Sequence, residues 1–171
     1  MGYSTDFEGQ FNITPTLKPE HQTYLEMFAE TRRMRRDAGL AEKLNDPVRI
    51  AAGLPIGHEG SYFVGGLGFT RQDKDASIVE YNYPPREQPG LWCKWVPTEE
   101  CDAIVWNGGE KFYDYVEWMQ YLLDHFLKLW GYKVNGEVCW VGEDNEDIGR
   151  IVISDNFLMK QIGYIQYVSV E

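Results

Sequence analysis

The clearest pattern in the chain lies in residues 106–140, where apolar positions follow first a helical and then a strand period. Apolar side chains recur at steps of three and four, the spacing of one helical face: Phe112, Val116, Met119, Leu123, Phe126, Leu127 and Trp130. The same period predicts a solvent-exposed opposite face: Asp114, Glu117, Tyr121, Asp124 and Lys128. Asn107 is the predicted N-cap and Gly131 the left-handed residue past the helix end. We expect a long helix that lies across a sheet.

Alternation of apolar and polar positions predicts the strands. They are expected at 7–13, 61–64, 91–97, 103–106, 137–141, 150–154 and 157–170. An Asn135-Gly136 turn and an acidic tip at 142–147 separate the last hairpin strands. The spacing of that tip does not match a calcium-binding EF-hand loop. A second long helix is expected at 20–37, with shorter helical segments at 41–44 and 47–52.

This order of elements predicts the fold class. Sequential antiparallel strands with helices on one face are typical of α+β proteins. We expect a single domain, 1–171, with a sheet of six to seven strands and two main helices on one face. The arrangement is a ferredoxin-like two-layer sandwich with a C-terminal meander.

Composition limits the class of protein. The chain has 171 residues, of which 15% are aromatic and 6 are Trp, which is typical of a folded core. No apolar run is long enough to span a membrane, and the N-terminus does not resemble a signal peptide. Its three cysteines have no C-x-x-C spacing. We therefore expect a cytoplasmic protein without metal or cofactor.

The negative charge is unevenly distributed. The formal net charge is -11, and residues 98–171 hold 14 Asp/Glu but only 5 Lys/Arg. Such a surface repels nucleic acid and attracts a basic partner, although it also simply keeps a protein soluble. The candidate binding residues are Asp114, Glu117, Asp124, Glu143, Asp144, Glu146 and Asp147.

The only basic cluster is the run RRMRR at 32–36. Its position near the end of the predicted helix indicates a charged, solvent-facing terminus, where the helix dipole favours cations. The alternative is contact with a phosphate or an acidic partner.

A long segment without regular pattern, 65–90, is the second candidate site. Loops of this length are uncommon in compact domains and often carry binding residues. Its glycine run lacks the spacing of a phosphate-binding motif. With the Trp-rich strand that follows, it offers a polar and stacking set for a small ligand: Arg71, Gln72, Tyr81, Asn82, Trp92 and Lys94. The same aromatics would equally pin the loop onto the core.

Catalytic residues are not indicated. Cys93 is expected to be a buried apolar side chain rather than a nucleophile. His58 with Asp73 and Asp75 would supply acid–base chemistry only if the fold brought them together. We therefore predict no catalytic residues and leave enzymatic activity as the third hypothesis.

Several sequence blocks carry a resemblance to known proteins: YFVGG, QPGLWCKW, GGEKFYDYVEW and NGEVCWVGE. With these blocks the chain resembles a family of small uncharacterised proteins of phages, prophages and bacterial genomes. More weakly, it is similar to YubB-like ferredoxin-type proteins of mobile elements. The resemblance implies a mobile-element origin and supplies no catalytic residues.

Two functions follow as leading hypotheses. The first is a non-enzymatic phage accessory protein that binds a host protein with a basic surface and inhibits a nucleic-acid-handling defence system. The alternative is a protein that binds or sequesters a nucleotide-like ligand through the 65–90 loop and the Trp-rich strand. We expect no direct nucleic acid and no membrane contact, and an exposed edge strand of the meander would allow a homodimer.

Overall fold

The fold is built on a six-stranded antiparallel sheet with strand order β4-β5-β1-β6-β7-β8. The computed structural model describes residues 2–65 and 75–171. The strands are β1 (Thr5–Thr14), β4 (Trp95–Pro97), β5 (Ala103–Trp106), β6 (Lys133–Gly142), β7 (Ile148–Ser154) and β8 (Phe157–Ile162). The central pair, β1 and β6, stays in register over ten residues, from Thr5 opposite Gly142 to Thr14 opposite Lys133.

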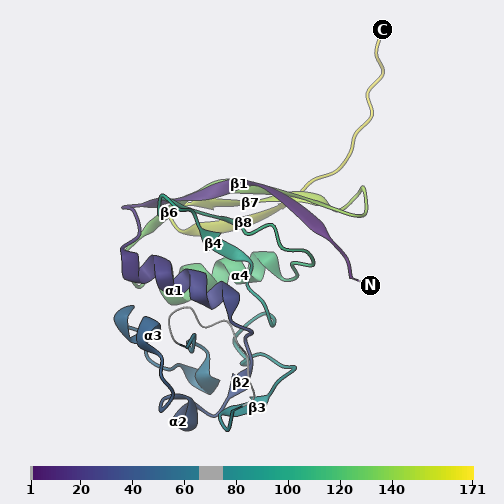
Figure 1. Cartoon of the computed structure of the whole chain (residues 1–171). Coiled ribbons are helices and arrows are strands. Elements are labelled where there is room, and N and C mark those ends of the chain that lie inside the picture. Colours follow the sequence, from purple (N-terminus) through teal and green to yellow (C-terminus); the bar gives the residue numbers. More distant parts are fainter. Residues whose placement is uncertain (1, 66–74) are drawn as a thin grey trace.

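Two helices cover one face of this sheet, α1 (Pro19–Glu30) and α4 (Tyr115–Leu122) (Figure 1). Taken with β1, β4, β5 and β6, they give the β-α-β-β-α-β order of a ferredoxin-like fold, and β7 and β8 extend its sheet as a meander. The predicted α+β class, strand number and C-terminal meander are confirmed.

Between helix and sheet the core is mainly aromatic. Trp95 is fully buried, and its ring lies 5.4 Å from Phe7, 5.5 Å from Phe11 and 5.2 Å from Phe112 between ring centroids. Edge-to-face contacts of this kind are favourable beyond the area that they bury. The odd positions of β1 and the inner positions of β4 therefore meet, as their alternation predicts.

A segment inserted between α1 and β4 forms a further layer beneath the helices (Figure 1). It contains β2 (Arg35–Arg36), α2 (Ala38–Ala41), α3 (Pro47–Ala51), η1 (His58–Gly60) and β3 (Ile78–Glu80), and β2 pairs with β3. Three side chains of the helical layer bond to it: Tyr24 Oη donates to the Tyr62 carbonyl, Trp130 Nε1 donates to the Ala52 carbonyl, and Tyr121 Oη accepts from Gln88. The helices are thus buried on two sides.

The arginine run 32–36 belongs to this layer, so the prediction of a solvent-facing helix end is wrong. Helix α1 ends at Glu30, and Thr31 is extended, with its hydroxyl bonded to the Met27 carbonyl at 2.6 Å. Arg33 and Arg36 are buried. Arg36 pairs with Asp75 at 3.1 Å and lies over the Phe63 ring.

Arg33 has no carboxylate partner in the described part of the chain. Its Nη2 donates to the Ser61 carbonyl at 2.7 Å, its Nε to Gln88 at 3.4 Å, and its guanidinium lies 4.1 Å from the centre of the Phe28 ring. Nη1 is buried without a hydrogen-bond partner among the described residues. A buried charge of this kind is costly unless many groups hold it, and Arg33 therefore ties the insertion to α1.

Helix α4 is shorter than predicted. Asn107 is not its N-cap, because the helix starts at Tyr115 and Phe112 is buried in an irregular segment before it. The Asn107 side chain instead bonds the N–H of Gly109 at 2.8 Å. A π-helical turn, η2 (Leu123–Leu127), continues α4, and Gly131 ends it with φ 88°, as predicted. Tyr121, expected on the wet face, is buried by the insertion.

Three further predictions are corrected by neighbouring structure. Residues 61–64 form no strand. Asn135-Gly136 is no turn but part of β6, where Gly136 (φ 140°) faces Phe11 so closely that a Cβ would lie 2.5 Å from the Gln10 carbonyl oxygen. The last strand stops at Ile162 instead of reaching 170. Its neighbour β7 begins at Ile148, whose carbonyl accepts from Gly163, so later residues have no β7 residue opposite them.

We expect Arg33→Ala to lower the free energy of unfolding by about 3 kcal/mol, because it removes a buried cation–ring contact and the bond to the Ser61 carbonyl and leaves the buried Gln88 Oε1 without its donor. Urea denaturation followed by fluorescence measures the loss. Arg86→Ala is the matched control: its side chain is 73% exposed, and we expect a change within about 0.5 kcal/mol. Equal losses in the two variants would contradict the role given to Arg33.

Candidate functional site

The structure divides the predicted ligand-binding set. Trp92 and Lys94 lie in one cleft. Tyr81 and Asn82 instead bind Arg32, whose guanidinium lies 4.3 Å from the centre of the Tyr81 ring and bonds the Asn82 side chain at 3.2 Å. Arg71 and Gln72 lie outside the described residues.

The predicted acid–base trio is not assembled by the described residues. Asp75 bonds Arg36 and Ser77, and these bonds lower its pKa despite its partial burial. His58 is exposed and lies 3.6 Å from Glu59. Asp73 falls outside the described residues.

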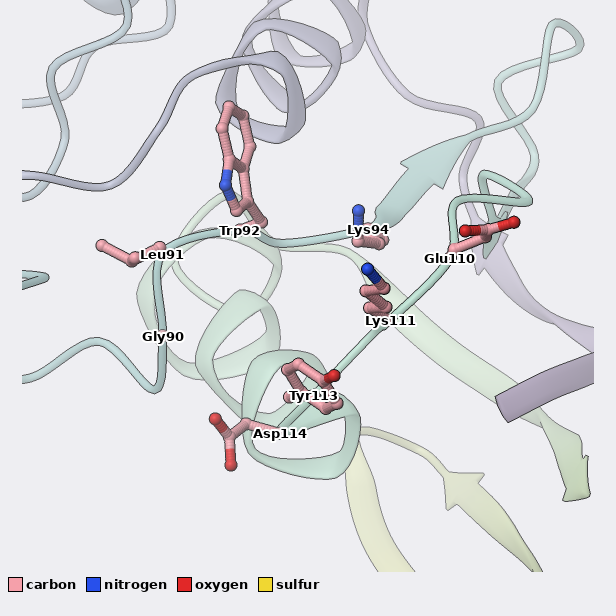
Figure 2. A pocket seen from close by; sticks show the side chains of 8 residues that line it. All are labelled: Gly90, Leu91, Trp92, Lys94, Glu110, Lys111, Tyr113 and Asp114. Atoms are coloured by element: carbon pink, nitrogen blue, oxygen red, sulfur yellow. The ribbon is translucent and has the colours of Figure 1, made fainter. Parts of the chain in front are cut away.

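The cleft that holds Trp92 and Lys94 is formed by two irregular segments, one leading into β4 and the other into α4. Its volume is about 380 Å³, within the range of small-molecule sites. The lining residues are Gly90, Leu91, Trp92, Lys94, Glu110, Lys111, Tyr113 and Asp114 (Figure 2). The cleft therefore brings together two segments about twenty residues apart in the sequence, one before and one after the β4–β5 hairpin.

Backbone bonds hold the first wall, residues 90–94. The N–H of Arg33 donates to the Leu91 carbonyl at 2.8 Å, and the N–H of Asn107 donates to the Lys94 carbonyl at 3.0 Å. On the other wall, Lys111 and Asp114 have positive φ angles of 58° and 55°. Left-handed backbone is unfavourable for such residues and clusters at ligand sites. The 110–114 wall therefore has unfavourable backbone angles, and it lies opposite a wall held by backbone bonds.

Two cations face this cleft. Figure 2 draws the ammonium of Lys111 toward Lys94, between Glu110 at one end of the wall and Asp114 at the other. Neither lysine has an ion-pair partner among the described residues. Beside them, the side chains of Trp92 and Tyr113 are 37% and 50% exposed. The cleft can thus offer positive charge and aromatic surface to one ligand.

One corner of the cleft adds a hydrogen-bonding pair. A Cβ on Gly90 would lie 3.4 Å from Asp114 Oδ2 and 3.7 Å from Trp118 Nε1. That indole N–H is fully buried and has no hydrogen-bond partner within the described structure. Burial, and then the neighbouring Glu117, raise the pKa of Asp114. The Asp114 carboxylate, an acceptor, and the buried Trp118 indole N–H, a donor, therefore both lie next to Gly90.

The predicted acidic residues form two groups joined by Tyr3. At the β6–β7 tip, Asp147 accepts bonds from Tyr3 Oη and Trp140 Nε1, and Glu143 accepts one from the N–H of Ser4. The N–H of Tyr3 donates to Tyr113 Oη at 3.1 Å, beside Asp114 at the start of α4. Asp147 is therefore a structural carboxylate rather than a free surface charge.

The other acidic residues remain exposed. Asp144 and Glu146 lie at the tip, and Asp114 and Glu117 on the first turn of α4. Asp124, further along, is paired with Lys128 at 2.8 Å. The predicted acidic surface is thus confined to the end of the molecule where the tip meets the start of α4.

A second groove, of about 430 Å³, lies between residues 86–89 and the outer side of α4 and η2. His125 lines it; its ring stacks on Tyr121 at 4.0 Å between ring centroids, and its Nδ1 bonds Tyr62 Oη at 2.8 Å. His21 is held in the same way, stacked on Trp130 at 3.9 Å with Nδ1 bonded to Tyr132 Oη. Burial lowers the pKa of both histidines. They tie layers together in their neutral form.

Other chemistry finds no support in the described part of the chain. Burial raises the pKa of Cys93 to about 12, so its thiol is inert, as predicted. No group of three His, Cys, Asp or Glu side chains there could hold a metal ion. None of the described helices is long and apolar enough to cross a membrane.

Sequence reasoning missed the wall at 110–114 and the Gly90 corner. Its helical period ran through Phe112 and assigned Glu110, Lys111 and Tyr113 to a helix. The signal that contradicts this period is the Gly108-Gly109 pair, because consecutive glycines disfavour helical backbone where the predicted helix would start.

Comparison with known proteins found no matching family model, no similar curated protein and no similar solved structure. The resemblance to phage and prophage proteins therefore stays a prediction.

We expect the free energy of unfolding to fall as the pH is lowered from about 7.5 to about 5.5, because the unfolded chain protonates His21 and His125 first, near their ordinary pKa of 6.5. The stability contributed by a lowered histidine pKa is present above that value and is lost as the pH falls toward the folded pKa. Urea denaturation across this range measures the slope.

His125→Asn and His21→Asn should each flatten this pH dependence, since Asn can keep the bond made by Nδ1. His58→Asn is the control, because the side chain of His58 is 66% exposed. Identical slopes in all four proteins would contradict the role of the buried histidines.

Proposed function

We propose that the cleft between residues 90–94 and 110–114 binds a small nucleotide-like ligand, that is, a planar aromatic ring carrying an anionic group. The observation that carries this proposal is that one cleft gathers two lysines without ion-pair partners among the described residues and two exposed aromatic side chains, and that one of its two walls has left-handed backbone. The chain would act as a binding or sequestering protein.

Each group in the cleft has a role in this proposal. The ammonium groups of Lys94 and Lys111 bind the anion through charge-assisted hydrogen bonds, which are stronger than neutral ones. Trp92 and Tyr113 stack on the ring, as aromatic side chains do with nucleobases. Asp114 accepts a hydrogen bond from an amino group on the ring edge. A purely apolar or purely anionic ligand would use only half of the site.

Binding without covalent catalysis fits the lining. The described residues that face the cleft include no histidine, cysteine or serine. Stacking and ion pairing give affinity, and the carboxylates of the lining, Glu110 and Asp114, have no serine, cysteine or histidine in the described lining with which to form a nucleophile–base pair. Sequestration of the ligand is therefore the activity to test first.

We expect at least one of the four common ribonucleoside monophosphates to quench tryptophan fluorescence with a Kd below about 1 mM. The variant Lys94→Ala/Lys111→Ala should weaken that binding at least about tenfold, because two charge-assisted contacts are lost. Lys43→Ala/Lys133→Ala is the matched control: it removes the same charge from exposed positions outside the cleft and should bind as the wild type does. Absence of binding by all four nucleotides, or equal weakening in both variants, would contradict the proposal.

A second probe tests the Gly90 corner. Gly90→Ala places a methyl group at ordinary contact distance from its neighbours, and the backbone there is not left-handed, so we expect an unchanged melting temperature. If the ring edge reaches Asp114, the methyl group fills its space and affinity falls about tenfold or more. Retained affinity in a folded Gly90→Ala protein would place the ligand elsewhere in the cleft.

A second candidate function is binding of a host protein with a basic surface. The observation that favours it is the link through Tyr3, which brings the exposed carboxylates of the β6–β7 tip and those at the start of α4 to one end of the molecule. We propose that Asp114, Glu117, Glu143, Asp144 and Glu146 form this surface. Inhibition of a nucleic-acid-handling defence system would then occur by occupying the groove that normally holds phosphates.

Charge reversal separates this candidate from the first. We expect Asp144→Lys/Glu146→Lys to abolish salt-sensitive capture of a host protein and to leave nucleotide affinity unchanged, since both residues lie at the β6–β7 tip and neither lines the cleft. The pull-down is washed at low and high salt, with bound proteins identified by mass spectrometry. Capture that survives both reversals, or that ignores salt, would contradict an acidic binding surface.

A further inference from the structure

The chain that follows β8 projects from the body of the protein (Figure 1). Gly163 makes the last backbone bond to the sheet, donating to the Ile148 carbonyl at 2.9 Å. Beyond it, no backbone hydrogen bond joins residues 164–171 to the described remainder of the chain. The reason is geometric: β7 starts at Ile148, so a longer final strand has no neighbour left to pair with.

This segment, 164–171, is mainly apolar, and all its residues are exposed, Ile165 at 50%. The exposed fractions are 79% for Tyr164, 91% for Tyr167, 73% for Val168 and 91% for Val170. Aromatic and β-branched residues favour strands. A protruding strand-forming segment of this composition would be an aggregation hazard unless something covers it.

The sheet has an open edge of matching length. Strand β8 is the last of the sheet, so its outer edge carries unpaired backbone groups along six residues. The segment 164–169 has the same length as β8 and follows it directly, with Gly163 between them. Each copy of the chain therefore holds both an open edge and a strand that can fill one.

We propose that two copies of the chain pair about a twofold axis at Gly163, with residues 164–169 of each copy adding antiparallel to β8 of the other. Such an interface is isologous: every contact occurs twice and both edges are closed together. The result is a continuous sheet through both protomers.

The sequence selects this register. Leu158, Lys160 and Ile162 share the helix-side face of the sheet, because they pair with Ile153, Ile151 and Gly149. An axis at Gly163 sets Tyr164 opposite Ile162, Gln166 opposite Lys160 and Val168 opposite Leu158, so that apolar residues meet apolar ones and polar meets polar.

Other registers are worse. A shift of the axis by half a residue would put opposite faces together. A shift by one residue sets either Gln166 over Leu158 or Val168 over Lys160. On the outer face, the favoured register also pairs Tyr167 with Met159, which is 42% exposed in the single chain.

Sedimentation equilibrium of the full chain tests the proposal, with twice the monomer mass expected. Truncation after Gly163 should give a monomer, and Val168→Asp should raise the dimer Kd at least about tenfold. Leu129→Asp is the matched control, since Leu129 is 71% exposed but lies outside the tail and β8. A monomeric wild type at about 100 µM, or a dimer that survives truncation, would overturn the proposal.

Disulfide trapping tests the register. In a Cys139→Ser background, Met159→Cys/Tyr167→Cys should form a covalent dimer on mild oxidation, because directly opposed strand residues lie within disulfide range. Lys160→Cys/Tyr167→Cys is the off-register control, and after the same oxidation it should form no more covalent dimer than the Cys139→Ser background. Equal trapping in the two variants, or none in the first, would overturn the pairing about Gly163.

Discussion

The structure depends on the burial of one guanidinium. Arg33 lies where α1, the inserted layer and α4 meet, held by the Ser61 carbonyl, Gln88 and the face of Phe28. Gln88 in turn donates to Tyr121 on α4. Because an unpaired buried charge is expensive, the surrounding groups are committed to a single arrangement. The ferredoxin-like part and the insertion are thereby fixed to each other by polar contacts at Arg33 in addition to the apolar contacts of Val48, Ala52, Leu54 and Val64.

The candidate cleft follows from that joint. The backbone N–H of Arg33 binds the Leu91 carbonyl, so the residue that closes the joint also positions the first wall of the cleft. Helix α4, whose Tyr121 is part of the joint, begins at Tyr115, directly after Asp114 on the second wall. The first wall is held by its backbone bonds to Arg33 and Asn107, and the left-handed Asp114 of the second wall accepts a backbone bond from Trp118 on α4. The exposed Trp92 and Tyr113 then have fixed backbones on either side of an opening.

The sheet and its two covering helices were predictable because their periods are long and their buried faces continuous. Strand β1 and helix α4 bury the residues that alternation and helical period indicate. The joint was not predictable: a run such as RRMRR is normally solvated, and only the insertion, whose contacts are non-local, buries Arg33 and Arg36. The cleft was only partly predicted, for a related reason. Trp92 and Lys94 were identified from a predicted strand, 91–97, of which only Trp95–Pro97 forms, whereas the opposing wall was assigned to a predicted helix.

Asp114 couples the two candidate functions. It lines the cleft, where its carboxylate lies near the Gly90 wall, and it also belongs to the exposed acidic end completed by the β6–β7 tip. A basic protein that pairs with Asp114 would cover the mouth of the cleft, and a ligand that bonds Asp114 would remove it from the acidic surface. Binding of the two partners should therefore be antagonistic. The tail lies outside the cleft, but Tyr164, Ile165 and Tyr167 line a hollow with Asn145 and Glu146 of the tip, so dimerisation bears on the acidic surface rather than on the cleft.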